Sequence, residues 1–358
     1  MGAEREAPGA PRVDAAGPDS ASPPDAARPV AVLGAGSWGT ALAIQLARSG
    51  RATRLWARGA EQLNALSRDR TNARYLPGAA FPDSLAIPQN LPAALEGALD
   101  VLVVVPSHAF RAVLTEIAPL LNAGARVAWA TKGFELASGL LPHQVAREVL
   151  GSARSTAVLS GPTFAREVGK GLPTAMTVAS TNVEFATALA HGLSSNNFRA
   201  YTSADIVGVE TGGAVKNVLA VGAGLSDGMG FGANTRIALI TRGLVEMTRL
   251  GMTLGAQRET FMGLAGLGDL VLTCTDDQSR NRRFGLLLAA GRSPEQALVE
   301  IGQAVEGYLA AKAVHLVAHR AGVDMPISDG IYRVLYENLP ARDLVRDLMT
   351  RPIKSEHQ

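Results

Sequence analysis

The stretch Ala31-Val32-Leu33-Gly34-Ala35-Gly36-Ser37-Trp38-Gly39-Thr40-Ala41 decides the fold of this chain. An apolar strand runs into three glycines at G-x-G-x-x-G spacing, and an apolar helix follows. Gly34 permits the tight turn, Gly36 lets a pyrophosphate approach the backbone, and Gly39 lets the helix pack closely on the sheet. The first N–H groups of the helix then face the phosphates. Because a second strand over 53–56 comes next, we predict a dinucleotide-binding unit rather than an ordinary strand-to-helix turn.

Arg58 bears on which dinucleotide binds. An NAD site usually carries Asp or Glu about 20 residues past the glycine turn, where it holds the ribose 2′-hydroxyl. Here the second strand is followed by Ala57 and Arg58. An arginine attracts a 2′-phosphate, which an acid would repel. We therefore expect NADP, with NAD also accepted. That Arg58 is an ordinary solvated loop residue stays open, since Glu61 lies close by.

Composition limits the possible functions. The 358 residues leave room for two domains, and a net charge of +2 gives no sign of a nucleic-acid or polybasic membrane surface. No run of about 18 apolar residues predicts a membrane span. The single cysteine, Cys274, excludes an intramolecular disulfide, which suits the cytoplasm, and we interpret it as a core residue rather than a nucleophile. No metal is expected.

Four segments differ in their patterns. Residues 1–28 are rich in Ala, Pro, Gly and Asp and are expected to be a disordered tail. Over 29–203, strands alternate with helices, which predicts an α/β domain with a Rossmann-type, doubly wound, mostly parallel sheet. Over 204–342 the strand signals disappear, so we expect an all-helical substrate and catalytic domain. Residues 343–358 are taken as a C-terminal tail. Substrate should lie in the cleft between the domains.

The periodicity also predicts individual elements. The expected strands are 30–33, 53–56, 101–105, 125–130, 156–159, 174–179 and 198–202. The expected helices of the second domain are 206–226, 233–254, 281–290, 294–300, 306–321 and 327–337.

Two polar motifs follow predicted strands. In ATKGFE, Lys132 comes directly after strand 125–130, and ligands of open sheets bind at the carboxyl ends of strands. The alternative is a surface loop lysine. In SGPTFA, Gly161 offers a backbone N–H and Thr163 a hydroxyl to a polar ligand. A helix N-terminus capped by Thr163 is an equally good interpretation of this motif.

Lys216 is the candidate acid/base group. It lies in an apolar predicted helix, ETGGAVKN, with Gly212 and Gly213 one turn earlier on the same face. Glycines inside a helix cost about 1 kcal/mol each relative to Ala. They leave a notch big enough for a small ligand or a closely approaching backbone. A lysine desolvated there should have a lowered pKa, as acid/base catalysis near neutral pH requires. The alternative is a lysine that snorkels over a helix–helix contact.

Further charged residues follow toward the C-terminus. In AGLGDL, Asp269 sits in a small apolar turn. Ser279 is a good N-cap for the next helix, and Arg280 at that N-terminus combines a fork of donors with free N–H groups, which suits a phosphate. A solvated basic face fits the neighbouring Arg282 and Arg283 better. Glu306 adds a carboxylate at the start of a later helix.

Together these pieces resemble one family, the bacterial-type NAD(P)-dependent glycerol-3-phosphate dehydrogenases. The motifs GAGSWGTA, VPSH, ATKGFE, SGPTFA, ETGGAVKNVLA, AGLGDL, SRNR and GQAVEGY stand in the family's order over roughly residues 29 to 340. The resemblance implies reversible reduction of dihydroxyacetone phosphate to sn-glycerol 3-phosphate, which supplies glycerophospholipid synthesis, and a homodimer. The direction of flux and feedback inhibition are not evident from the sequence.

The resemblance also implies site residues. Lys216 would be the proton donor and acceptor, and Asp269 would orient it or a substrate hydroxyl. Besides the three motif glycines, the implied cofactor contacts are Ser37, Trp38, Arg58, Lys132, Ala165, Arg280, Ala304 and Glu306. The implied substrate contacts are Lys132, Gly161, Thr163, Lys216, Asp269, Ser279, Arg280 and Asn281. The departures from the family pattern are the long N-terminal tail and Ala304, where relatives often carry a larger apolar residue.

Two rival functions remain. A 3-hydroxyacid or 6-phosphogluconate-type dehydrogenase also joins a Rossmann domain to helices that carry a lysine, but the Ser279-Arg280-Asn281 cluster argues against it. A catalytically inactive NADP-binding sensor would be expected to lack Lys216 or Asp269, and both are present.

Overall fold

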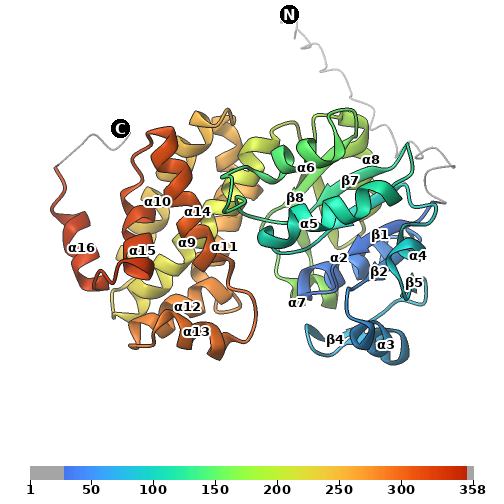
Figure 1. The fold of residues 1–358 in the computed structure, drawn as a ribbon. Coiled ribbons are helices and arrows are strands. Elements are labelled where there is room, and N and C mark those ends of the chain that lie inside the picture. Colours follow the sequence, from blue (N-terminus) through green and yellow to red (C-terminus); the bar gives the residue numbers. More distant parts are fainter. Residues whose placement is uncertain (1–27, 353–358) are drawn as a thin grey trace, which may run out of the picture.

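In the computed structural model, which describes residues 28–352, a sheet-based part precedes a helical part (Figure 1). The sheet has eight strands in the order β10-β9-β8-β7-β6-β1-β2-β5. Neighbouring strands are parallel except β8 and β9, so the expected mostly parallel sheet is confirmed. The predicted N-terminal tail lies, apart from Arg28, outside the described residues.

The elements of the first part agree with the predicted strands to within one or two residues. The strands are β1 (Val30–Leu33), β2 (Thr53–Trp56), β3 (Thr71–Asn72), β4 (Leu76–Ala80), β5 (Leu85–Ala86), β6 (Asp100–Val103), β7 (Arg126–Trp129), β8 (Thr156–Ser160), β9 (Thr174–Ala179) and β10 (Phe198–Ser203). The helices are α2 (Ser37–Arg48), α3 (Ala60–Asp69), α4 (Leu91–Leu95), α5 (Ser107–Ile117), α6 (Pro142–Leu150), α7 (Ala165–Lys170) and α8 (Val183–Leu193). The strands β3 and β5, which were not predicted, have only two residues each, and the unpredicted β4 contains Pro77 and Gly78, which are depleted in strands.

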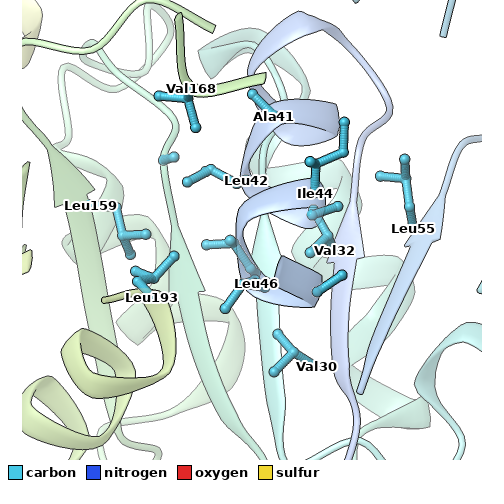
Figure 2. Packing of buried hydrophobic residues seen from close by; sticks show 14 of the residues in the cluster. Val30, Val32, Ala41, Leu42, Ile44, Leu46, Leu55, Leu159, Val168 and Leu193 are labelled. Atoms are coloured by element: carbon cyan, nitrogen blue, oxygen red, sulfur yellow. The ribbon is translucent and has the colours of Figure 1, made fainter. Parts of the chain in front are cut away.

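Side chains of the central strand β1 alternate between two apolar layers. Val30 and Val32 pack with α2 and α8 on one face (Figure 2), whereas Ala31 and Leu33 belong to the cluster under α4, α5 and α6. All four side chains are buried. Burial on both faces explains why the parallel strands are almost continuously apolar rather than alternating with polar residues.

The glycine turn lies at the carboxyl end of β1, which is flanked by β2 and β6. Gly34 has a φ of +114°, and a Cβ there would overlap the carbonyl oxygen of Val104. A Cβ on Gly39 would overlap the carbonyl oxygen of Gly34, so the first turn of α2 packs tightly against the strand. Apart from Gly36 itself and its neighbours along the chain, no atom of residues 28–352 lies within 4 Å of the place where a Cβ of Gly36 would be. The turn is therefore closed at its base and open at its tip.

The helical part is built around α9 (Ile206–Gly228), which is buried on all sides from Gly208 to Ser226. Around it lie α10 (Ala233–Thr253), α11 (Asp269–Thr275), α12 (Arg280–Ala289), α13 (Pro294–Ile301), α14 (Glu306–Ala321) and α15 (Pro326–Tyr336), with short turns η2 (Arg258–Met262) and η3 (Leu264–Gly268). Glycines allow the closest crossing, because a Cβ on Gly224 of α9 or Gly285 of α12 would overlap the other helix's backbone.

Two expectations need correction. Residues 343–349, expected in a C-terminal tail, belong to the helix α16 (Ala341–Met349), whose Leu344 is buried against Gly330 of α15. The helix is short, and its one buried residue, Leu344, stands among charged residues, so the sequence pattern gave little indication of a helix. Residues 353–358 lie outside the described part. Asp269 does not sit in a turn but begins α11, because the preceding residues Leu264–Gly268 form the short π-helix η3, which leads directly into it.

The glycine turn gives a matched pair of substitutions. Gly39→Ala should destabilise the protein by about 1–3 kcal/mol, because a methyl group against a backbone oxygen forces the strand and helix apart. Gly36→Ala should keep the thermal stability of the wild type and instead weaken dinucleotide binding. Thermal unfolding and a fluorescence titration with NADPH would measure the two effects. Equal destabilisation by both substitutions would contradict this account of the turn.

Candidate active site

A cavity of about 620 Å³ opens where the carboxyl end of the sheet meets the helical part. Its walls come from the glycine turn, the β3–β4 hairpin, the loops after β7 and β8, and helices α9, α11, α12 and α14. Eleven of the predicted site residues line it: Ser37, Trp38, Lys132, Thr163, Ala165, Lys216, Asp269, Ser279, Arg280, Asn281 and Glu306.

At the centre of this cavity one carboxylate holds two lysines. Lys132 donates to Asp269 Oδ2 with an Nζ–O distance of 2.7 Å, and Lys216 donates to Asp269 Oδ1. Asp269 is 1% exposed and Lys216 is 7% exposed. A buried carboxylate is tolerated only when its charge is compensated, and here it has two cationic donors. The cluster of three groups carries a net positive charge, which suits an anionic ligand.

The pKa values of the three groups are shifted in different directions by burial and by the charges within the cluster. Burial is the largest effect on Lys216, and together with repulsion from Lys132 it lowers the Lys216 pKa to about 8, against the attraction of Asp269. Burial would also lower the pKa of Lys132, but the charge of Asp269 raises it above its usual value. Burial would raise the Asp269 pKa, but the two lysines hold it below its usual value. Lys216 is therefore the group that exchanges a proton most readily near neutral pH.

The two glycines before Lys216 let three segments meet. A Cβ on Gly212 would lie 2.6 Å from the carbonyl oxygen of Ala265, in the turn that leads into Asp269. A Cβ on Gly213 would lie 3.4 Å from the Lys132 stem. The predicted notch is thus filled by a neighbouring backbone and by the second lysine, which decides between the two occupants that the sequence left open.

Thr273 completes this cluster and was not predicted. Its hydroxyl accepts from Lys216 Nζ at 3.0 Å and donates to the backbone oxygen of Asp269 at 2.6 Å. It lies four residues after Asp269 on the helix α11, so both side chains share one face. Recognising that helix in the sequence would have suggested Thr273.

A second polar layer joins three helices behind Lys216. Asn217 donates to Glu306 at 3.1 Å and accepts from Asn281 at 2.8 Å. The Asn281 carboxamide oxygen in turn accepts from the backbone of Gly307 at 2.9 Å. Asn217 was not predicted as a site residue from the sequence. The predicted contact residue Asn281 therefore uses one amide N–H and its carboxamide oxygen in hydrogen bonds within residues 28–352. Its other amide N–H has no partner among these residues and could donate to a ligand.

The residues predicted to bind a phosphate lie together at the N-terminus of α12. The Ser279 hydroxyl accepts from the backbone of Arg282 at 3.2 Å, so the predicted N-cap is confirmed. Arg280 lines the cavity and makes no hydrogen bond or ion pair with residues 28–352. Its guanidinium is free to bind an anion. Arg282 instead pairs with Asp227 at 2.7 Å and also with Asp277, and it does not line the cavity.

The open tip of the glycine turn fits a dinucleotide pyrophosphate. The N-cap of α2 is Gly36, and no side chain caps its first N–H groups. The carbonyl of Ala35 is held from behind by Gln62 at 2.8 Å and by Asn72 at 3.0 Å. Asn72 also donates to Thr40 at 2.8 Å, so the turn is rigid while its outer surface stays accessible.

Six predicted residues do not line the cavity: Gly34, Gly36, Gly39, Arg58, Gly161 and Ala304. The three turn glycines act through the backbone geometry given above. Arg58 is 71% exposed just past β2, 3.8 Å from Glu116. Gly161 is buried with a φ of +147°, and a Cβ there would lie 2.9 Å from Met176, which makes packing a sufficient reason for this glycine. Ala304 is exposed two residues before Glu306.

Thr163 does not cap the following helix. The N-cap of α7 is Phe164, and the Thr163 hydroxyl donates to the Gly161 carbonyl at 3.3 Å. The alternative interpretation of SGPTFA as a capped helix start is therefore wrong, and Thr163 is one of the residues that line the cavity.

Comparison with known proteins agrees with this geometry. Residues 29–186 match the family model of the NAD-dependent glycerol-3-phosphate dehydrogenase N-terminus, and residues 205–346 match that of the C-terminus. The chain belongs to the NAD-dependent glycerol-3-phosphate dehydrogenase family. The predicted family, the enzyme class and the use of NAD(P) are thereby confirmed.

Individual relatives of the family span nearly the whole chain. The glycerol-3-phosphate dehydrogenase [NAD(P)+] of Actinobacillus pleuropneumoniae serotype 3 is 55% identical over 329 residues, 92% of this chain and 98% of the relative. That of Pseudoalteromonas translucida is 56% identical over 328 residues, 91% and 98%. The crystal structure of glycerol-3-phosphate dehydrogenase from Coxiella burnetii has a TM-score of 0.88 at 47% identity, covering 91% of this chain and 99% of that one.

Among residues 28–352, no helix combines the length and apolar character needed to cross a membrane. Within the same range, no group of three or more His, Cys, Asp or Glu side chains is arranged to hold a metal ion. Cys274 is buried in the core of the helical part, where burial raises its pKa to about 12, so it is unsuited to be a nucleophile.

The lowered pKa of Lys216 predicts opposite pH profiles for the two directions of a dehydrogenase reaction. With Lys216 as the proton donor, reduction would need its ammonium form, so kcat for reduction should fall as the pH rises through about 8. Oxidation needs the neutral amine as acceptor, so its kcat should rise through the same pH. Initial rates in both directions over pH 6–10 would test this. Inflections only near the ordinary lysine value of about 10.4 would rule out a lowered pKa.

Proposed function

We propose that this chain interconverts dihydroxyacetone phosphate and sn-glycerol 3-phosphate with NADP(H), accepts NAD as well, and thereby supplies glycerophospholipid synthesis. The observation that carries the proposal is the pair of lysines on the buried Asp269, in the same cavity as Arg280, which pairs with no residue of 28–352. One part of the cavity offers a proton donor beside a positive cluster, and the other offers an anion site. A small phosphorylated ketone needs both.

In this proposal the chain's residues position the ketone and supply its proton. The bound nicotinamide supplies the hydride that reaches the carbonyl carbon. Lys216, as the ammonium, stabilises the negative charge that develops on the carbonyl oxygen and gives that oxygen its proton. Asp269 and Thr273 hold the Lys216 amine in place through the hydrogen bonds described above. Lys132 adds a second positive charge on the same side.

Arg280 would hold the substrate phosphate. It stands at the N-terminus of α12, where Ser279 caps the helix and the dipole favours negative charge. Asn281 and Thr163, which also line the cavity, would complete the contacts to the polar substrate. Gly161 would contribute only through its backbone. Binding the phosphate at a fixed distance from Lys216 brings the carbonyl to the reactive position.

The dinucleotide would extend from the glycine turn to this substrate site. Backbone N–H groups of Ser37, Trp38 and Gly39 would hold the pyrophosphate, and Ala165, Lys132 and Glu306 would lie along its nicotinamide half. Arg58 would take the 2′-phosphate, because it stands exposed past the end of β2 with only a distant acidic partner. Ala304 stays a proposed contact next to Glu306.

The assembly and location are also proposals. A homodimer is supported by large apolar side chains that the helical part leaves exposed, among them Ile237, Val299 and Met349. Light scattering after size-exclusion chromatography would measure the mass directly. The cytoplasm is supported by the single cysteine, which can form no intramolecular disulfide.

Turnover of dihydroxyacetone phosphate with NADPH tests the proposal directly. Lys216→Ala should fold normally and lose about 10²–10⁴-fold in kcat, the usual contribution of a positioned acid/base group. Circular dichroism and thermal unfolding would show that the variant is folded. If Lys216→Ala kept more than a tenth of the wild-type rate at saturating substrate, the assignment of Lys216 would fail.

Arg280→Lys should not restore phosphate binding, because a point charge cannot reproduce the two-pronged guanidinium contact. Loss of this contact should lower kcat as well as raise KM. The deciding quantity is the ratio of kcat/KM for dihydroxyacetone phosphate to that for dihydroxyacetone, which should fall. An unchanged ratio would move the phosphate site elsewhere, with Lys132 the next candidate. A loss confined to NADPH affinity would make Arg280 a cofactor residue.

Arg58→Ala should impair the reaction with NADPH more than the reaction with NADH, since only NADPH carries the 2′-phosphate. The measurement is kcat/KM for each cofactor in the variant and the wild type. Equal losses with both would reduce Arg58 to a general contact of the adenosine or to a bystander.

A further inference from the structure

A second buried carboxylate lies outside the cavity, at the junction of the two parts. Glu210 on α9 is 3% exposed. Its Oε1 accepts from Trp129 Nε1 at 2.9 Å and from the backbone N–H of His143 at 2.9 Å. The His143 ring Nδ1 lies 2.6 Å from Oε2. One carboxylate thus ties the helix α9 of the helical part to β7 and α6 of the sheet part.

The residues that form this link, Trp129 and Glu210, lie close in sequence to Lys132 and Lys216, respectively. Trp129 ends β7, and Lys132 follows three residues later in the loop that leaves the strand. Along α9, Gly213 and Lys216 follow Glu210 at three and six residues, so they lie about 4.5 and 9 Å further along the helix axis. At Gly213 the helix passes the Lys132 stem. No direct contact between Glu210 and either lysine is needed for Glu210 to control their spacing.

We propose that Glu210 is a positioning residue, which sets the distance between Lys132 and Lys216 by fixing α9 against the end of β7. This inference rests on the proposed roles of the two lysines. Asp269 can hold both ammonium groups only if their Nζ atoms approach its two oxygens together. Those lysines come from different parts of the fold, and Glu210 on the helix accepts a hydrogen bond from Trp129, the last residue of the strand.

The chemistry of Glu210 agrees with a fixing role. Burial raises its pKa, and the hydrogen bonds from His143 and Trp129 oppose that shift. A carboxylate with three donors from two elements allows little lateral movement, because any slide of α9 leaves a buried donor without a partner. An apolar contact at the same place would permit sliding. Misplacement of a catalytic group by about 1 Å can cost on the order of 10²-fold in rate.

The chain supplies a matched control in Glu246. It is also 3% exposed, and its carboxylate accepts from the backbone N–H of Ile327 at 2.7 Å, the backbone N–H of Ser328 at 3.0 Å and the Ser328 hydroxyl at 3.0 Å. All of these groups belong to α10 and α15 in the helical part. Glu246 is therefore as buried and as hydrogen-bonded as Glu210, but it links no element that carries a site lysine.

The experiment compares Glu210→Ala with Glu246→Ala. Both should lower the unfolding temperature by similar amounts. At a temperature where unfolding curves show both variants to be folded, Glu210→Ala should lose about 10–100-fold in kcat, and Glu246→Ala should stay within about twofold of the wild type. Glu210→Gln, which keeps an oxygen acceptor for Trp129 and His143, should recover most of the loss. Equal kcat values for the two alanine variants would overturn the proposal.

A second readout does not depend on turnover. The pH dependence of Lys216 acylation by an amine-reactive ester, followed by mass spectrometry, reports the pKa of that lysine. Because Lys132, Asp269 and Glu306 all act on Lys216, a change in spacing should shift the Lys216 pKa in Glu210→Ala and not in Glu246→Ala. An unchanged Lys216 pKa in both variants would also overturn the proposal.

Two further comparisons keep the test decisive. If Glu210→Ala does not fold, Trp129→Phe can replace it, because this substitution removes only the indole donor. Trp129→Phe should show the same pKa shift and a smaller loss of kcat. If both effects are absent in Trp129→Phe, the proposal is overturned. If the wild type fails to reduce dihydroxyacetone phosphate, the proposed function falls, whereas the Lys216 pKa comparison still decides whether Glu210 sets the spacing.

Discussion

One buried carboxylate between two ammonium groups is the constraint on which the rest of the structure depends. Asp269 can be buried only because Lys132 and Lys216 compensate its charge. Each of the three residues comes from a different element, so the strand β7, the helix α9 and the start of α11 have to converge within hydrogen-bonding distance. The glycines of α9, the turn before Asp269 and the tie at Glu210 all serve that convergence.

Close approach of backbones also governs the fold at a larger scale. In the glycine turn, in the crossing of α9 with α12 and at Gly212, a methyl group would overlap a carbonyl oxygen or come too close to one. These positions cost helix stability, because glycine loses more conformational freedom on folding than other residues. Burial of α9 on all sides compensates for that cost, since its Ala, Val and Leu side chains between Val209 and Leu225 contribute apolar surface to the core.

The elements that could be predicted are those whose signals are local. Periodicity and spacing predict the strand-turn-helix of β1 and α2, the apolar strands and the helix α14 (Glu306–Ala321). The positions of Lys132, Lys216, Asp269 and Arg280 in one cavity followed from motifs in a known order. The missed features depend on partners far away in the chain. Thr273 and Asn217 are ordinary helix residues until α11 and α14 pack beside them, and β5 is a strand only because β2 lies next to it.

The central helix α9 has a consequence for how the chain is made. Ile206 and Val209 at its start are buried in the apolar layer on one face of the sheet, together with Ala265 from much later in the chain. Translation runs from the N-terminus, so the strands of the sheet, which end at Ser203, are synthesised before Ala265, which helps to cover this face. A chain that ends before Ala265 would leave part of this apolar layer exposed to solvent.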